Sequence, residues 1–127
     1  MTKICIVDDD ETIRNFLVLT LKESGYETVD YESAKDFMLS CDCGHFDLII
    51  SDIIMDEIDG VALLQFIKER TPNLPVIMIS AEGGYEDNNG FNINLIQGML
   101  KEMGAVTLMH KPIDAHRLID YIKSILK

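Results

Sequence analysis

The sequence predicts an α/β protein, a doubly wound parallel sheet of five strands and five helices in the order (βα)₅. The main observation is that short apolar runs alternate with amphipathic stretches along all 127 residues. The apolar runs have the length of strands and cover residues 4–7, 26–31, 46–50, 75–79 and 105–109. The amphipathic stretches have helical spacing and cover residues 11–24, 33–39, 60–70, 93–103 and 114–126. A strand that is followed each time by a helix favours parallel strands with helices on both faces of the sheet.

In the first half of the chain, the expected elements have recognisable starts and stops. Asp8-Asp9-Asp10 stops the first apolar run, and the helix that follows ends at Gly25, a residue that suits the turn after a helix. Ser33 is the expected N-cap of the second helix. The almost wholly apolar run from Phe46 to Ile50 stops at Ser51-Asp52, which is typical of a strand buried on both faces.

The second half shows the same kind of punctuation. Thr71-Pro72-Asn73 breaks the third helix, because proline cannot continue a helix. Residues 82–90 are rich in Gly and Asn and predict a loop before the fourth helix. Gly104 ends that helix, and Asp114 is the expected N-cap of the last one.

Length, hydrophobicity and charge exclude several classes of protein. With 127 residues, 47% of them hydrophobic, we expect one domain that covers residues 1–127. No apolar run approaches the roughly 20 residues that span a bilayer, and the first run is too short for a signal peptide, so we expect a cytoplasmic protein. The formal net charge of −11 would repel a phosphate-rich polymer. We therefore expect neither nucleic-acid binding nor membrane binding.

Residues that can carry chemistry stand directly after the predicted strands. Asp8-Asp9-Asp10 follow the first strand, Asp52 follows the third, Ser80 the fourth and Lys111 the fifth. The carboxyl ends of parallel strands meet at one edge of the sheet, where ligands bind. Clustered carboxylates raise one another's pKa unless a cation relieves the repulsion. Mg²⁺ combines carboxylates with phosphate oxygens, and a Lys and a Ser suit the other phosphate oxygens, so the pattern indicates phosphoryl chemistry.

Each of these residues, taken alone, also has an ordinary structural explanation. Asp10 fits the N-cap of the first helix. Asp52 fits an acid in a turn, Ser80 a loop hydroxyl with a hydrogen-bond partner, and Lys111 a surface charge. Phosphoryl chemistry is favoured because each relevant strand end carries a suitable residue type.

The same residues belong to five motifs, Ile4-Cys5-Ile6-Val7-Asp8-Asp9-Asp10, Leu48-Ile49-Ile50-Ser51-Asp52-Ile53-Ile54-Met55, Asp59-Gly60, Pro75-Val76-Ile77-Met78-Ile79-Ser80-Ala81 and His110-Lys111-Pro112. In this order and spacing they resemble the receiver domains of two-component response regulators, over essentially the whole chain. The resemblance implies a flavodoxin-like sheet with strand order 2-1-3-4-5. It also implies a phosphorylation-dependent switch rather than a conventional enzyme. Its partners would be a histidine kinase or histidine phosphotransfer protein, and a downstream protein or fused output domain.

Carried over residue by residue, the resemblance makes Asp52 the phosphoacceptor. It implies that Mg²⁺, or Mn²⁺, is bound by Asp9 and Asp52, by Asp8 mostly through a water, and by the backbone carbonyl of Ile54.

The remaining implied roles concern the phosphoryl oxygens. Ser80 would donate a hydrogen bond to one of them and Lys111 would pair with another. A cis Lys111-Pro112 bond, which the resemblance also implies, would direct the lysine into the site.

Three features depart from the family's usual pattern. Leu108 stands three residues before the lysine, where an aromatic residue is usual, which puts a readout by a ring in question. Asp56 stands where proline is common. The segment 82–90 lengthens the interval between Ser80 and Lys111. It is either an ordinary surface loop or a lid or partner surface beside the site.

Four other interpretations remain open at this stage. Asp8-Asp9-Asp10-Glu11-Thr12 fits the start of haloacid-dehalogenase-type phosphatases, with Asp8 as nucleophile and Asp10 as general acid. A degenerate receiver would bind proteins without being phosphorylated. Cys41-Asp42-Cys43-Gly44-His45 contains potential zinc ligands but lacks a second pair at zinc-finger spacing. A flavin-binding protein would need a Gly-, Ser- or Thr-rich phosphate cradle where this chain has carboxylates.

Overall fold

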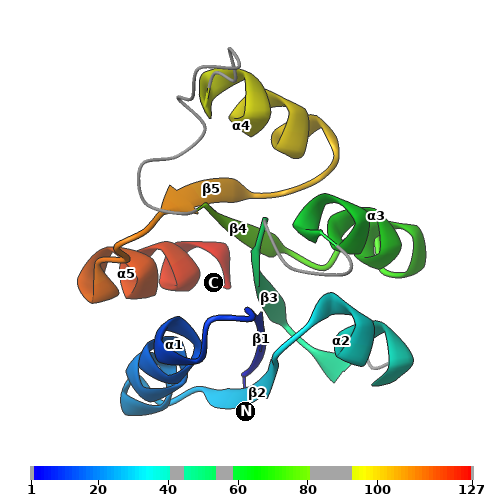
Figure 1. Ribbon diagram of the computed structural model, residues 1–127. Coiled ribbons are helices and arrows are strands. Elements are labelled where there is room, and N and C mark those ends of the chain that lie inside the picture. The colour runs from blue at the N-terminus through cyan, green and yellow to red at the C-terminus, as the bar shows by residue number, and fades with distance from the viewer. Residues whose placement is uncertain (1, 41–44, 54–58, 81–92, 127) are drawn as a thin grey trace.

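The computed structural model describes residues 2–40, 45–53, 59–80 and 93–126, with the backbone alone at 93–97. Within these residues, strands and helices alternate in the expected order (Figure 1). The elements are β1 (Lys3–Val7), α1 (Glu11–Glu23), β2 (Glu27–Tyr31), α2 (Ala34–Ser40), β3 (Leu48–Asp52), α3 (Gly60–Arg70), β4 (Val76–Ser80), α4 (Ile93–Glu102), β5 (Thr107–His110) and α5 (Ala115–Ile125).

The strands form one sheet in which all neighbours are parallel, in the order β2-β1-β3-β4-β5. The predicted fold class and strand order are therefore confirmed. Helices α1 and α5 cover one face of the sheet, and α2, α3 and α4 cover the other (Figure 1). The chain runs from β1 to β2 on one side and then returns to the other side of β1 for β3. In open sheets of this kind, ligands bind beyond the carboxyl ends of the strands at such a reversal.

Alternate side chains of the central strands enter different halves of the core. Ile4 and Ile6 of β1 belong to the cluster on the α1 and α5 face, which includes Leu17. Cys5 and Val7 belong to the cluster on the opposite face. All four β1 residues are fully buried. Because both faces of the sheet are covered, the strands are apolar at successive positions rather than at alternate ones.

Three strands both begin and end one or two residues later than the sequence predicts. β3, β4 and β5 include Asp52, Ser80 and His110 as their last residues. Asp52 lies opposite Ile79, and Ser80 lies opposite His110, in continuous parallel pairing. The backbone makes these ladder hydrogen bonds whatever the side chain, so a polar residue does not by itself end a strand. The sheet therefore holds Asp52 and Ser80 directly.

The predicted helix caps are confirmed. The Asp10 carboxylate accepts hydrogen bonds from the amides of Thr12 and Ile13. The Asp114 carboxylate accepts one from the amide of Arg117 at 3.2 Å. The Ser33 hydroxyl accepts a hydrogen bond at 3.0 Å at the start of α2. Gly25 and Gly104, with φ of 92° and 107°, follow α1 and α4 in a backbone conformation that other residues rarely adopt.

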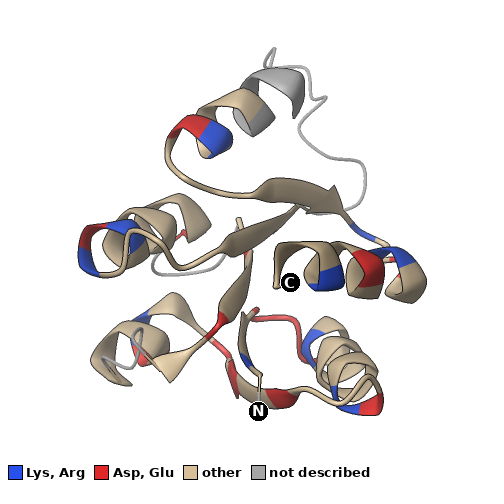
Figure 2. Ribbon diagram, turned by 180° about the vertical axis from the view of Figure 1, so that it is seen from behind, with Lys and Arg blue, Asp and Glu red and all other residues tan. Residues whose placement is uncertain are grey.

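No helix in the described part of the chain is long and apolar enough to cross a membrane. Lys and Arg are dispersed among the helices, in the view of Figure 2, rather than gathered on one face.

Candidate functional site

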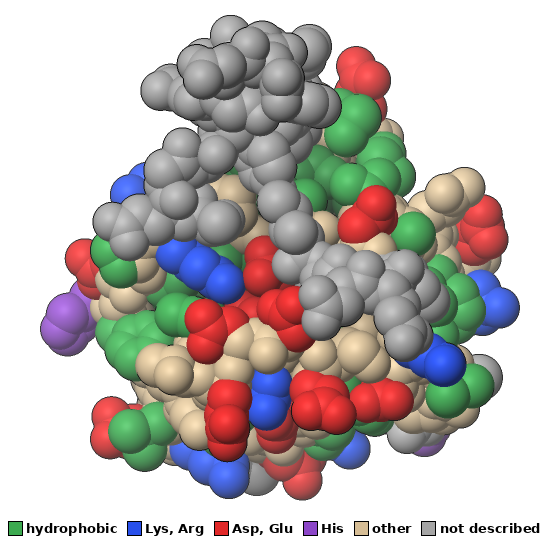
Figure 3. All heavy atoms as spheres, in the orientation of Figure 1, with side chains coloured by type: hydrophobic (Ala, Val, Ile, Leu, Met, Phe, Trp, Pro, Cys, Tyr) green, Lys and Arg blue, Asp and Glu red, His purple; other side chains and the backbone are tan. Residues whose placement is uncertain are grey.

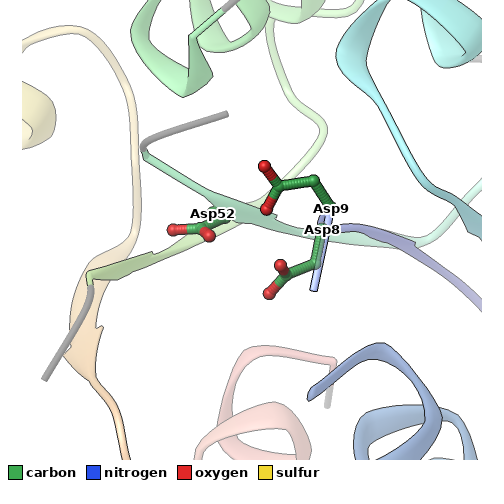
Figure 4. Close-up of side chains that lie close together, drawn as sticks. All are labelled: Asp8, Asp9 and Asp52. Carbon is green, nitrogen blue, oxygen red and sulfur yellow. The ribbon is translucent and has the colours of Figure 1, made fainter. Parts of the chain in front are cut away.

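Acidic side chains from two strands meet at the carboxyl edge of the sheet. Asp8 and Asp9 directly follow β1, and Asp52 ends β3, the parallel neighbour of β1. One carboxylate oxygen from each of the three lies within 4.8 Å of the other two. Figure 4 shows the three side chains close together at the ends of their strands. Acidic side chains also gather at the centre of the face in Figure 3, beside a basic one.

This cluster fits a hard divalent cation. Asp8 is 1% exposed and Asp52 is 5% exposed, whereas Asp9 is open to solvent. Asp8 Oδ1 accepts a hydrogen bond from the Asp10 amide at 2.9 Å, but the buried Oδ2 has no hydrogen-bond partner within the described residues. A buried carboxylate oxygen left in this way costs free energy. An ion such as Mg²⁺, which takes a few carboxylate oxygens and completes its shell with water and phosphate, would remove that cost.

Lys111 supplies a positive charge to the same place. Its Nζ donates a hydrogen bond to Asp52 Oδ2 at 3.2 Å. It also forms an ion pair with Asp8 Oδ2 at 3.3 Å. Burial lowers the pKa of Lys111, but the charges of Asp52 and Asp8 outweigh burial, so the pKa is raised above its usual value. The ammonium is therefore charged at neutral pH.

The backbone aims this lysine. The Lys111-Pro112 peptide bond is cis, as the resemblance implies. The Lys111 amide donates a hydrogen bond to the carbonyl of Ser80, the last residue of β4, at 2.9 Å, which continues the pairing of β4 and β5 one residue past the end of β5. Lys111 thus enters the site from a main chain that is tied to β4.

Ser80 lies where the sequence predicts, at the carboxyl end of β4, and is fully buried. Its Oγ lies 2.5 Å from Nδ1 of His110. The sequence offered no reason to expect this contact, since His110 was noted only as part of the motif that contains Lys111.

Arg14 is a second residue of the site that the sequence analysis missed. Its guanidinium donates a hydrogen bond to the carbonyl of Asp8 at 2.8 Å and pairs with Asp30 of β2 at 3.0 Å. Arg14 holds the main chain of the acidic turn in this way. The sequence contained one indication of this role. Arg14 precedes Leu17 by three residues and Leu21 by seven, so it lies on the buried stripe of α1, where a charged residue needs a partner.

Helix α3 begins directly against the backbone of Asp52. The Gly60 amide donates a hydrogen bond to the carbonyl of Ile53 at 2.6 Å. A Cβ at Gly60 would lie only 2.1 Å from the carbonyl oxygen of Asp52. This close approach requires glycine and fixes the start of α3 relative to the site.

Several sequence-based expectations fall on residues outside those described. These are the Ile54 carbonyl as a metal ligand, Asp56, the segment 82–90 and the Cys41–Cys43 pair. Leu108 is described: it is 6% exposed and packs in the core cluster on the α2, α3 and α4 face.

Comparison with known proteins identifies relatives along the whole chain. Residues 4–123 match the family described as the response regulator receiver domain. The chain is 31% identical over 124 residues to the transcriptional regulatory protein GlrR of Escherichia coli K12. The matched region covers 98% of this chain and 26% of GlrR. It is 32% identical over 120 residues to the response regulator protein FleR of Pseudomonas aeruginosa, and this match covers 94% of this chain and 24% of FleR. The chain therefore spans about a quarter of the length of these relatives.

Solved structures share the fold. A response regulator receiver domain protein from Clostridium thermocellum has a TM-score of 0.84 and 24% identity, with 99% of this chain and 94% of that chain covered. NtrX from Brucella abortus has a TM-score of 0.83 and 32% identity, with 99% of this chain and 27% of NtrX covered.

Proposed function

This chain belongs to the response regulator receiver domain family, and from that premise we propose that Asp52 is its phosphoacceptor and that Asp8, Asp9 and Asp52 hold a Mg²⁺ ion. One observation carries the proposal. The carboxylate oxygens of the three aspartates lie within 4.8 Å of one another, and the ammonium of Lys111 lies 3.2 Å from Asp52. A buried carboxylate beside a fixed positive charge can attack a phosphoryl group whose oxygens that charge then stabilises.

The reaction is a transfer from a phosphohistidine to an aspartate. A carboxylate oxygen of Asp52 attacks phosphorus, and the new O–P bond forms as the P–N bond breaks. The imidazole nitrogen leaves with the electron pair of that bond. Lys111 contacts the phosphoryl oxygens, where negative charge is spread in a loose transition state. Ser80 donates a hydrogen bond to one of these oxygens once the phosphoryl group is on Asp52. Water later attacks phosphorus, restores the Asp52 carboxylate and releases inorganic phosphate.

The metal, when bound, screens the carboxylates from one another and offsets charge on the phosphoryl oxygens. Mn²⁺ could take the same oxygen ligands. The Ile54 carbonyl, outside the described residues, remains a proposed ligand on the resemblance alone.

The proposed partners follow from the family. The phosphodonor is a histidine kinase or a histidine phosphotransfer protein, and the phosphorylated form acts on a downstream protein or on a fused output domain. The much greater length of GlrR and FleR supports the second possibility. Residues 1–127 form one receiver domain, and its place of action is the cytoplasm.

The phosphatase alternative has less support. It requires Asp10 as general acid, but the Asp10 side chain accepts hydrogen bonds from the amides of Thr12 and Ile13 as the N-cap of α1. It also gives no role to Asp52, which is buried against Lys111.

Phosphorylation by a small donor tests the proposal. The protein is incubated with acetyl phosphate and Mg²⁺, and hydroxylamine-labile phosphate is measured on the wild type, Asp52→Asn and Asp36→Asn. Asp36 is an exposed acid on α2, so its variant is the matched control. We expect one acyl phosphate per chain, lost in Asp52→Asn and in EDTA and kept in Asp36→Asn.

The position of the label separates the alternatives. Borohydride reduction followed by peptide mass spectrometry locates the acyl phosphate. Label on Asp52 supports the receiver, and label on Asp8 would support the phosphatase. Absence of label under these conditions would overturn the proposal in favour of a degenerate receiver.

A further inference from the structure

The buried hydroxyl of Ser80 is already engaged by a side chain of the neighbouring strand. Ser80 ends β4 and His110 ends β5, and the two residues lie directly opposite each other in the parallel register. Ser80 is fully buried, and its Oγ lies 2.5 Å from His110 Nδ1. Among the described residues, His110 is the side chain within hydrogen-bond distance of this hydroxyl.

A hydroxyl has one proton, and this limits what Ser80 can do. If Nδ1 of His110 accepts that proton in a hydrogen bond, the proton is not available to another acceptor. Phosphoryl oxygens only accept hydrogen bonds. With Nδ1 as the acceptor, Ser80 can donate to a phosphoryl group on Asp52 only after its bond to His110 has broken.

We propose that His110 is a positioning residue, which holds the Ser80 hydroxyl through Nδ1 in the unphosphorylated protein and releases it when Asp52 is phosphorylated. This inference rests on the proposed function. His110 acts through Ser80 and contributes to the balance between the two states without touching the phosphoryl group.

When His110 releases Ser80, its imidazole changes its contacts at the protein surface. His110 is exposed and lines a pocket of about 140 Å³ between β5 and α5, together with Leu108, Arg117 and Tyr121. Leu108, on the same strand, is buried and has no polar atom that could follow Ser80. The imidazole of His110 is therefore placed to transmit the state of the hydroxyl to this pocket.

The first experiment observes the imidazole itself. Long-range ¹H–¹⁵N correlation spectra of the full chain report which ring nitrogen carries the proton and whether Nδ1 accepts a hydrogen bond. In the free protein, we expect Nδ1 of His110 unprotonated and hydrogen-bonded. After addition of Mg²⁺ and beryllofluoride, a stable phosphoryl mimic, its resonance should move to that of a free nitrogen. The resonances of His116, an exposed residue of α5, should not move.

The second experiment measures the competition. His110→Ala should bind beryllofluoride roughly 5- to 10-fold more tightly than the wild type, because Ser80 no longer gives up a hydrogen bond. His110→Asn, whose amide oxygen replaces Nδ1 as an acceptor, should restore most of the wild-type affinity. His116→Ala is the matched control and should leave the affinity unchanged.

A double-mutant cycle separates this role from a merely structural one. In a Ser80→Ala background, His110→Ala should have no further effect on beryllofluoride affinity. An equal effect with and without Ser80, or an unmoved His110 resonance, would overturn the inference. If Asp52 is phosphorylated but His110 does not respond, the proposed function stands and this inference fails. If Asp52 takes no phosphoryl group from acetyl phosphate, both fail.

Discussion

Replacement of Gly60 by alanine tests how closely α3 is packed against the phosphoacceptor strand. The new Cβ would lie 2.1 Å from the carbonyl oxygen of Asp52 and 2.7 Å from Cα of Ile53. Both contacts are with backbone, so a change of rotamer cannot relieve them. The start of α3 or the end of β3 must move by about 1 Å, since Cβ atoms essentially never come closer than 3.0 Å to another heavy atom.

The expected cost is about 2 kcal/mol of unfolding free energy. Overpacking of a close contact costs roughly 1–3 kcal/mol, and a rigid backbone contact belongs at the upper end. The better helix propensity of alanine returns at most about 1 kcal/mol at the first position of a helix. With a urea m-value of about 2 kcal/mol/M, the midpoint of unfolding should fall by about 1 M.

Gly98→Ala is a control within the same chain. Gly98 lies inside α4, is exposed, and has no atom within 4 Å of the position of an added Cβ. Alanine there should raise the unfolding free energy by about 0.5–1 kcal/mol, because glycine is a poor helix former. The same substitution is therefore expected to have opposite signs at two helical positions.

Urea unfolding followed by circular dichroism measures both variants. Gly60→Ala should also slow phosphorylation by acetyl phosphate by about 10-fold or more, because the shift displaces Asp52 relative to Lys111. If Gly60→Ala unfolds at the same urea concentration as Gly98→Ala, the reasoning from this close contact is refuted.

Three further predictions concern the N-cap, the metal and the lysine. Asp10→Ala should lower the unfolding free energy by about 1 kcal/mol in urea titrations, since two amides at the start of α1 lose their acceptor; no loss would contradict the cap. Mg²⁺ at about a hundred times its Kd should raise the unfolding free energy by about 2.7 kcal/mol, and Asp8→Asn should lose most of this gain, whereas an equal gain would exclude Asp8 from the site. The raised pKa of Lys111 means that its ion pairs stabilise the fold fully below the ordinary pKa of 10.5 and lose this contribution as pH rises through the higher folded value. The stability difference between the wild type and Lys111→Met in EDTA should therefore shrink as the pH rises above 10.5, and a constant difference would be evidence against the ion pairs.

Much of the fold and part of the site could be predicted from local features. The alternation of apolar runs with helical spacing predicted each strand and helix that the described residues form, because the sheet is covered on both faces. Asp10, Ser33 and Asp114 were predicted as caps, since capping depends on a side chain and amides within three positions. The meeting of Asp8, Asp9 and Asp52 was predicted because parallel strands end at one edge of a sheet.

The strand ends were predicted less well, for a physical reason. Asp52 and Ser80 were expected after their strands, because a polar side chain seemed to stop an apolar run. The structure includes both in the sheet, since the backbone hydrogen bonds of β3, β4 and β5 continue past the last apolar residue.

By itself, the sequence determined the order of strands and helices and the type of residue at each strand end, because both depend on spacing along the chain. Three contacts around the site became visible only in the tertiary structure. Ser80 meets His110 because β4 and β5 pair in one register, and Arg14 reaches the carbonyl of Asp8 because α1 packs back on β1. Gly60 lies on Asp52 because α3 returns to the end of β3. Contacts between residues far apart in the chain depend on how the helices and strands pack, and no local pattern encodes that packing.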